Sequence, residues 1–474
     1  MKAARVVFAI APTLVLAACA VGPDYHGPPA MSTPNSFVRA PSASVSNEAP
    51  ETRWWTQLND PKLNDLVERA LQASPSVDIA TARLREARAA LSQERAKELP
   101  NTGASAAYAH AHGLTSAIGV SSDGASSDTN IFAIGFDATW EIDLFGAHRR
   151  AVEGAAASLE ATRAGLRDVY VTLSSEVAES YIQLRDGQQR VRLTERNIEI
   201  ERQLLELLKR RRAGGIASDL DVARLANQVD TTQATLGPLQ AMVVEQMDRL
   251  SLLTANTPGA LDQELGVPSG VPVPPEMVSI GDPAGMLRRR PDIASAERKL
   301  AQQTATIGQD MAALFPKLTL LGDVGFTAPR PSDLFKGSSF TWIAAPLLQW
   351  TPFDFGRNKA KIQMARDARD EAEADYRRTV LAALQDAESS LNRFGRQRNT
   401  VGDYASARAS AEQVYALTEV RLRSGVASTT DLLDADSRRV QAQLSYQQAV
   451  AEMSTDFVSM QKSLGLGWFQ QPGQ

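Results

Sequence analysis

The sequence predicts a mainly α-helical fold with a small membrane β part. Between Arg357 and Arg423 there is no proline, and apolar side chains recur at steps of three and four residues. This spacing is typical of one buried stripe on an α-helix, which over that range would run about 100 Å. The chain also matches itself at an offset of about 210 residues, and each repeat carries two short segments in which apolar and polar residues alternate.

The first 18 residues have the features of a signal peptide. Two basic residues precede a short apolar run, and small residues then lead to Cys19, which is the only cysteine. This order resembles a bacterial lipoprotein cleavage site, which implies palmitate-type acylation of Cys19 and anchoring in outer-membrane lipid. The alternative is a cysteine that lies near a cleavage site by coincidence. Ala20 follows in place of an aspartate, which in lipoproteins generally permits sorting to the outer membrane.

The internal repeat rests on three pairs of landmarks. Pro75 and Pro100 bracket a helical pattern, and an equally long pattern is bracketed 216 residues later. Trp140 and the Gly215 turn each recur 210 residues later, as Trp350 and the Gly425 turn. One insertion explains the change of offset, so we infer a duplication. The predicted segments are a lipid-anchored extended strap at 19–60, repeat one at 61–250, an equatorial excursion at 251–282, repeat two at 283–464 and a tail at 465–474.

Each repeat is predicted to contain a helix, two strands, a very long helix, a glycine-bearing turn and a further helix. The two long helices have nearly equal lengths, and each matches two shorter helices stacked end to end. The chain would thus supply four helical columns. The helices are expected at 61–99, 147–212, 219–250, 284–315, 357–423 and 430–464.

The alternating segments are about as long as membrane-spanning strands. In the second segment, Phe132, Ile134, Phe136 and Trp140 share one face, which is the pattern of a transmembrane β-strand. A half-buried hairpin of a soluble protein shows the same alternation. Trp140, Trp342 and Trp350 are predicted membrane-interface aromatics. Four strands cannot close a barrel alone, so several copies must complete one barrel together. Pro346 lies inside the last strand, where a bulge or an unpaired position would tolerate it.

Composition and motifs exclude several other functions. The net charge is −5 and no basic patch dominates, so nucleic acid is not an expected partner. There is no P-loop and no Gly-x-Ser-x-Gly motif, so we predict neither an enzyme nor a cofactor. His110 and His112 lie on one face of a strand, but two ligands without a nearby carboxylate or thiolate make a poor metal site.

Motifs spread over nearly the whole mature chain resemble the outer-membrane factor (TolC-like) family, and specifically its lipoprotein branch typified by OprM, NodT and CusC. The resemblance implies a homotrimer, with a shared twelve-stranded barrel in the bacterial outer membrane above an α-helical tunnel in the periplasm. The motifs are Cys19-Ala20-Val21-Gly22-Pro23-Asp24-Tyr25, Trp54-Trp55 with Asp60-Pro61, Leu287-Arg288-Arg289-Arg290-Pro291-Asp292-Ile293, Phe353-Asp354-Phe355-Gly356-Arg357 and Leu432-Leu433-Asp434-Ala435.

The same resemblance implies a transport function. Such a protein is an exit duct that passively exports small molecules received from a periplasmic adaptor and an inner-membrane pump, as in RND efflux and multidrug resistance. The alternative is a lipid-anchored periplasmic coiled-coil adaptor or scaffold, which would carry a lipoyl-like or interrupted β-domain in place of two paired-strand segments. The exported compound and the identity of the pump stay open at this stage.

The turns after the two long helices are the predicted functional site. By resemblance they form adaptor-docking tips, and the helix after the second turn lines the closed periplasmic aperture, with Asp434 as the aperture acid beside Asp431 and Thr430. A ring of carboxylates at a narrow point favours cations. Helix capping is the alternative for the tips and for Asp431. The docking residues are Gly215, Ser218, Asp219, Asp221, Gly425 and Ser428.

Overall fold

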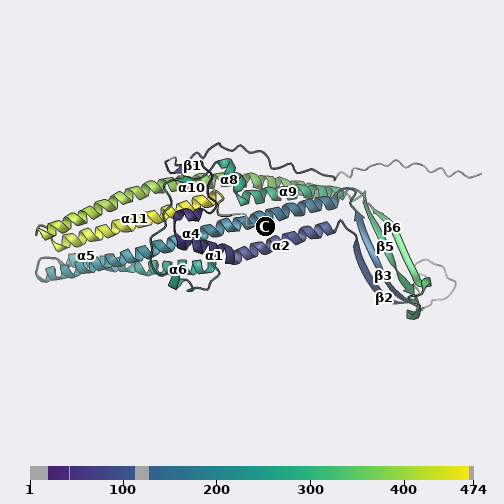
Figure 1. Cartoon of the computed structure of the whole chain (residues 1–474), viewed down its shortest axis with the longest axis horizontal. Coiled ribbons are helices and arrows are strands. Elements are labelled where there is room, and N and C mark those ends of the chain that lie inside the picture. The colour runs from purple at the N-terminus through teal and green to yellow at the C-terminus, as the bar shows by residue number, and fades with distance from the viewer. Residues whose placement is uncertain (1–19, 42, 113–127, 469–474) are drawn as a thin grey trace, which may run out of the picture. The chain divides into compact units, whose positions relative to one another are not determined.

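The structure is a computed structural model that describes residues 20–41, 43–112 and 128–468 (Figure 1). The predicted signal peptide and the predicted acylation site, Cys19, lie outside these residues. The chain divides into two compact units. Unit 1 contains Met1–Pro29, Arg85–Ala161 and Glu297–Ala374, and unit 2 contains Ala30–Leu84, Thr162–Ala296 and Asp375–Gln474. The two longest helices begin in unit 1 and end in unit 2.

Unit 1 holds one antiparallel sheet with the strand order β2-β3-β5-β6. The register of the two hairpins follows the repeat, because Asn101 pairs with Thr139 and, 216 and 210 residues later, Lys317 pairs with Gln349. The duplication therefore extends to individual backbone pairs. The strands are β2 (Asn101–His112), β3 (Asp128–Ile142), β5 (Lys317–Ala328) and β6 (Phe340–Gln349).

The predicted apolar residues of the strands share one face of this sheet. Phe136 of β3 lies opposite Val324 of β5, which in turn lies opposite Trp342 of β6. The side chains of Phe136 and Trp342 are 68% and 70% exposed, so this face is uncovered in the single chain. Pro346 belongs to β6, which is an edge strand, and an edge position tolerates the missing N–H donor.

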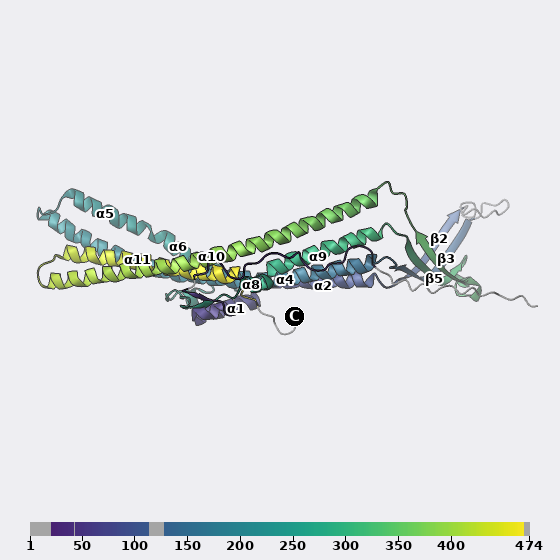
Figure 2. The same ribbon diagram turned by 90° about the horizontal axis from the view of Figure 1, so that it is seen from above.

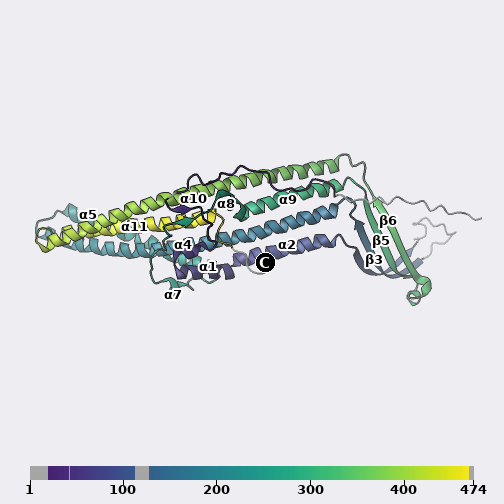
Figure 3. The same cartoon turned by 45° about the horizontal axis from the view of Figure 1, so that its top comes forward.

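Long helices dominate the rest of the chain (Figures 2 and 3). Within unit 2, α4 and α5 run side by side up to their connecting turn, and α10 and α11 do the same. The predicted bounds of the two long helices are confirmed within one residue. In the described part of the chain no helix is long and apolar enough to cross a membrane. The main helices are α2 (Pro75–Ala96), α4 (Ala147–Ala213), α5 (Asp219–Ala234), α6 (Leu236–Leu253), α9 (Pro291–Ala312), α10 (Arg357–Arg423) and α11 (Thr429–Ser463).

The prediction of three continuous shorter helices is wrong, and each one breaks shortly before a proline. The helix predicted at 61–99 is split into α1 (Pro61–Ala73) and α2 by Ser74, whose extended backbone is the conformation favoured before a proline. Arg290 splits the helix predicted at 284–315 into α8 (Pro283–Arg289) and α9 in the same way. The helix predicted at 219–250 breaks at Thr235, because Pro238 cannot donate to the carbonyl of Ala234.

The core of unit 2 begins where the strap ends. Trp54 and Trp55 are completely buried, and Trp54 packs edge-on against Phe457 with ring centroids 6.0 Å apart. The strap itself contains a short strand, β1 (Val45–Ser46), which pairs in parallel with β4 (Val278–Ser279). This pairing was not predicted. It fixes the strap to the segment between the repeats, which also contains the short helix α7 (Asp262–Leu265).

Candidate functional site at the helical turns

The turns after α4 and α10 have the same backbone. Gly215 and Gly425 have φ angles of 74° and 73°, and each glycine N–H donates to a carbonyl three residues earlier. The next residue donates across five residues, as Ile216 does to Arg211 at 2.8 Å. This pair of bonds is the Schellman motif, which ends a helix and satisfies its last carbonyls. An added Cβ on either glycine would meet no atom, so the left-handed backbone alone requires glycine here.

Each turn is followed by a capping box. The Ser218 hydroxyl accepts from the backbone N–H of Asp221 at 3.1 Å, and the Asp221 carboxylate accepts from the Ser218 N–H and hydroxyl. Ser428 and Asp431 repeat this arrangement at the start of α11. The Ser428 backbone N–H and then its hydroxyl lower the pKa of Asp431. Asp221, predicted at the docking tip, and Asp431, predicted at the aperture, therefore both cap a helix from its third position.

Asp219, predicted at the docking tip, and Thr430, predicted at the aperture, make separate contacts. Asp219 forms a salt bridge with Arg212, from Oδ1 to Nε at 2.6 Å. Thr430 accepts a hydrogen bond on its hydroxyl from Arg211 Nη1 at 2.9 Å. Since Arg211 lies in the last turn of α4 and Thr430 in the first turn of α11, this bond joins the tips of the two helical hairpins.

Asp434 points its carboxylate along the surface of α11. Its Oδ2 accepts from Arg438 Nε at 2.9 Å, one turn later in the same helix. Both side chains are more than half exposed, so solvent weakens their attraction and leaves the carboxylate accessible. An accessible anion at this place can interact with ions in solution, as the aperture prediction requires.

Asp436, two residues further along α11, was missed by the sequence analysis. It is 3% exposed and its carboxylate binds Arg196 of α4 at 3.0 Å and Arg439 of α11 at 2.6 Å. Removing a carboxylate from water is costly unless such partners bind it. The Arg439 contact, at i and i+3, was readable from the sequence, whereas the Arg196 contact joins residues 240 positions apart.

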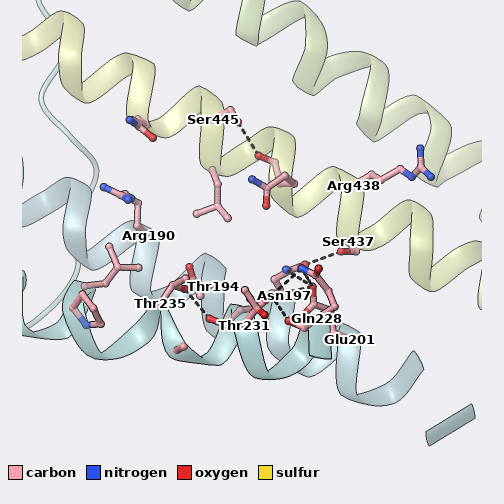
Figure 4. A pocket seen from close by; sticks show the side chains of 17 residues that line it. Arg190, Thr194, Asn197, Glu201, Gln228, Thr231, Thr235, Ser437, Arg438 and Ser445 are labelled. Carbon is pink, nitrogen blue, oxygen red and sulfur yellow. Dashed lines mark hydrogen bonds between the residues drawn. The ribbon is translucent and has the colours of Figure 1, made fainter. Parts of the chain in front are cut away.

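A groove of about 1090 Å³ lies beside Asp436 and Arg196, and most of the residues that line it are polar (Figure 4). Ser437 donates to Asn197 Oδ1 at 2.9 Å, and Asn197 donates to Glu201 Oε1 at 3.1 Å. Gln228 and Thr232 of α5 donate to the same Glu201 oxygen. The groove is thus lined by a hydrogen-bond network that connects α4, α5 and α11, and Figure 4 shows Arg438 extending away from it.

The predicted membrane-interface tryptophans have matching contacts in unit 1. The indole N–H of Trp140 donates to the Glu98 carbonyl at 2.9 Å, and that of Trp350 donates to the Leu314 carbonyl at 3.0 Å. Both acceptors follow the helix that precedes the hairpin. These rings therefore tie the end of each second strand to the start of its first strand. Trp342 lies near the start of β6, away from these two contacts, and is 70% exposed.

The segment that follows the predicted acylation site is held by Arg150. This guanidinium is 5% exposed and donates to the carbonyls of Val21 and Gly22 at 3.2 and 3.3 Å and to Asp24 at 2.6 Å. Gly22 has a φ of 95°, and a Cβ there would overlap Gly308 of α9. The start of the strap is therefore fixed against α4 and α9, all within unit 1.

His110, the member of the histidine pair whose side chain is described, lies beside an asparagine. His110 Nδ1 lies 2.9 Å from Asn130 Oδ1, and the side chain of His112 lies outside the described residues. Within the described ranges, no group of three or more His, Cys, Asp or Glu side chains is arranged to hold a metal ion.

The sequence profile of the family "Outer membrane efflux protein" matches residues 66–256 and 284–466. The chain is similar to "Nodulation protein T" of Rhizobium leguminosarum bv. trifolii, with 28% identity over 456 residues and 96% of both chains covered. It is also similar to "Pyoverdine export outer membrane protein OpmQ" of Pseudomonas aeruginosa, with 30% identity over 450 residues, 92% of this chain and 94% of that protein.

Solved structures share the fold. The outer-membrane channel OprN has 32% sequence identity and a TM-score of 0.85, with 95% of this chain and 100% of that chain covered. The open state of the MtrE outer membrane channel of Neisseria gonorrhoeae, at 23% identity and a TM-score of 0.79, shares the fold over 95% of this chain and 98% of its own. Because the family profile covers most of its length, this chain belongs to the outer membrane efflux protein family.

Proposed function

We propose that this chain is the outer-membrane exit duct of a tripartite efflux or secretion system. It passively passes small molecules from a periplasmic adaptor and an inner-membrane pump to the exterior. The observation that carries the proposal is the combination of a sheet with one exposed apolar face and two helices of 67 residues in a member of this family. Energy for export comes from the pump, because this chain carries no nucleotide-binding motif.

The two open edges of the sheet support a homotrimer. β2 and β6 each pair on one side only. In lipid, unpaired backbone groups cost several kcal/mol each, so a four-stranded sheet must be completed by other strands. Three copies supply twelve strands, which is within the range of closed membrane barrels, whereas one copy supplies too few.

The helical turns suit an adaptor. Both turns present exposed glycines, and the apolar side chains that follow them, Ile216 and Val426, are 76% and 66% exposed. The matched geometry of Gly215 with Ser218 and of Gly425 with Ser428 would offer the adaptor two similar contacts for each copy. Asp219 and Asp221 add negative charge to the first of them.

We assign the periplasmic aperture to the start of α11. Asp434 supplies the exposed carboxylate, and the hydrogen bond between Thr430 and Arg211 ties α11 to α4 at the level of the turn. Asp431 contributes charge beside them, although its carboxylate is engaged in the capping box. Opening would require α11 to move against α4, which breaks the Thr430 and Asp436 contacts to arginines of α4.

We also propose that Cys19 is acylated. The next residues are bound to Arg150 near the junction of β3 and α4, so the anchor would reach lipid beside the strands. Export of compounds by relatives, such as pyoverdine in the name of OpmQ, supports small molecules as the cargo class. The pump that is paired with this chain decides the particular compound.

A direct test uses the protein extracted from outer membranes in mild detergent. Native mass spectrometry is expected to find three acylated copies, and a cell that lacks its own exit duct is expected to accumulate less of a fluorescent pump substrate when this chain is supplied with its adaptor and pump. A soluble monomer after a Cys19→Ser change, without any effect on substrate accumulation, would instead support a lipid-anchored scaffold.

A further inference from the structure

The two junctions between a strand and a long helix differ in one aromatic ring. At the junction of β3 and α4, Phe145 stacks on Phe315, which lies between α9 and β5, with centroids 4.5 Å apart and planes 17° apart. At the junction of β6 and α10, the residue 210 positions later is Phe355, whose side chain is fully exposed at 103%. The first ring has a partner and the second is fully in solvent.

The backbone of Phe355 is also unusual. The glycines that follow the two rings match, with φ angles of 81° at Gly146 and 89° at Gly356. Phe355 itself has a φ of 55°, one of three positive values among the described non-glycine residues. A bulky residue in the left-handed region is an outlier, and such outliers concentrate where function needs them.

The partner that Phe355 lacks can be identified from the duplication. Phe315 precedes Pro316, and the residue 216 positions earlier is Leu99, which precedes Pro100 in the same way. Leu99 is 65% exposed. The tryptophan contacts confirm this equivalence, because Trp140 and Trp350 bind carbonyls that are also 216 positions apart.

Leu99 and Phe355 cannot meet within one chain. Leu99 precedes β2 and Phe355 follows β6, which are the two outer strands of the sheet, with β3 and β5 between them. Strands lie about 4.8 Å apart, so the two edges are separated by about 14 Å. The equivalents of Phe145 and Phe315, which are Phe355 and Leu99, therefore lie at opposite edges of the sheet.

We propose that Phe355 of one copy of this chain packs on Leu99 of a second copy and reproduces the contact between Phe145 and Phe315. This proposal rests on the oligomeric duct proposed above and adds its residue-level interface. The same offsets set the register between β6 and β2 of adjacent copies. Ala138 lies opposite Gly322 within one chain. Leu348 is 210 positions after Ala138, and Ala106 is 216 positions before Gly322. Leu348 of one copy therefore lies opposite Ala106 of the next.

Chemical cross-linking tests the ring contact. The double variant Phe355→Cys/Leu99→Cys, extracted from membranes as the intact oligomer, is treated with a short bismaleimide and run on a denaturing gel. We expect most of the monomer band to shift to covalent dimers and trimers. The matched control, Phe145→Cys/Phe315→Cys, is expected to react within one chain and to stay at the monomer mass. The parent chain, whose only cysteine is Cys19, and each single variant are expected to give no cross-linked species.

Absence of interchain products in a sample that native mass spectrometry shows to be trimeric, while the control pair loses its free thiols, would overturn the contact and leave the duct intact. That result would indicate that lipid covers Phe355. A monomeric sample in lipid-like detergent would overturn the proposed function as well.

A separate experiment tests the register between β6 of one copy and β2 of the next, with Phe355 and Leu99 left unchanged. Leu348→Cys/Ala106→Cys is expected to form an interchain disulfide on mild oxidation in several-fold higher yield than Leu348→Cys/Tyr108→Cys. Directly opposite Cβ atoms lie about 5 Å apart, and a shift of two residues takes them to about 7 Å. Equal yields, or a higher yield for the shifted pair, would contradict the inferred register.

Discussion

The two helical turns have the same backbone and different side chains around it. Both use a left-handed glycine and a serine–aspartate capping box. Thr430, Asp434 and Asp436, however, replace Leu220, Arg224 and Ala226 of the first repeat. The shared residues satisfy the backbone, whereas the three others bind arginines of α4 and α11. The difference separates residues that build a turn from residues that give the second turn a specific role.

The two long helices also differ at equivalent positions, and the largest expected effect concerns one such position, Asp186. Asp186 of α4 is 7% exposed, and burial raises its pKa to about 6. The nearby charge of Arg190 lowers this pKa, whereas that of Glu452 raises it further. The residue 210 positions later, Arg396, is exposed. One long helix therefore buries a carboxylate where its repeat carries a solvated arginine.

Replacing Asp186 by asparagine should stabilise the protein at neutral pH. Because the folded pKa is raised, the free energy of unfolding falls as pH rises from 3.8 to about 6 and stays lower above that. Asp186→Asn removes this loss, which amounts to at most about 3 kcal/mol. Denaturant unfolding at pH 4 and pH 8 measures the free energy of unfolding of both proteins. We expect Asp186→Asn to be more stable than the wild type at pH 8 alone. Arg396→Gln is the control, with a change below about 0.5 kcal/mol. An equal gain at both pH values would rule out ionisation as the cause.

The next effect concerns the contact that only the second repeat makes. Arg196→Met removes one of the two arginines bound to the buried Asp436 carboxylate, and hydrogen bonds to charged groups contribute about 2 kcal/mol. Hydrogen exchange of α11 near Asp436 should become faster by the corresponding factor. Ser406→Ala, at the repeat-equivalent position in α10, should leave exchange unchanged. If both variants exchange alike, the contact between Arg196 and Asp436 does not hold α11 to α4.

The smallest effect should be the same in both turns. Ser218→Ala and Ser428→Ala each remove a capping hydroxyl, which costs about 1 kcal/mol of helix stability. Limited proteolysis and hydrogen exchange at the starts of α5 and α11 measure the fraying. Equal effects would confirm that the boxes are structural. A much larger effect of Ser428→Ala would show that the second box also supports the aperture contacts.

Local patterns predicted much of this fold. The bounds of α4 and α10, the glycine turns and the face shared by the predicted apolar residues of the sheet followed from periodicity, composition and the repeat. Pro75 and Pro291 marked the starts of α2 and α9. Longer helices that run through Ser74 and Arg290 were also predicted, because apolar spacing continues across these residues. Pairings between distant residues, such as β1 with β4 and Arg196 with Asp436, leave no periodic signal in the sequence and are visible only in the folded chain.

The aperture assignment places the second turn beside the narrow point of a conducting duct. Single-channel recording in planar bilayers tests it, with purified wild-type protein, Asp434→Ala and Arg224→Ala as the repeat-equivalent control. We predict that Asp434→Ala raises the conductance or weakens the preference for cations, because it removes a carboxylate from the aperture, and that Arg224→Ala changes neither. Unchanged conductance and selectivity in Asp434→Ala would contradict the assignment of the aperture.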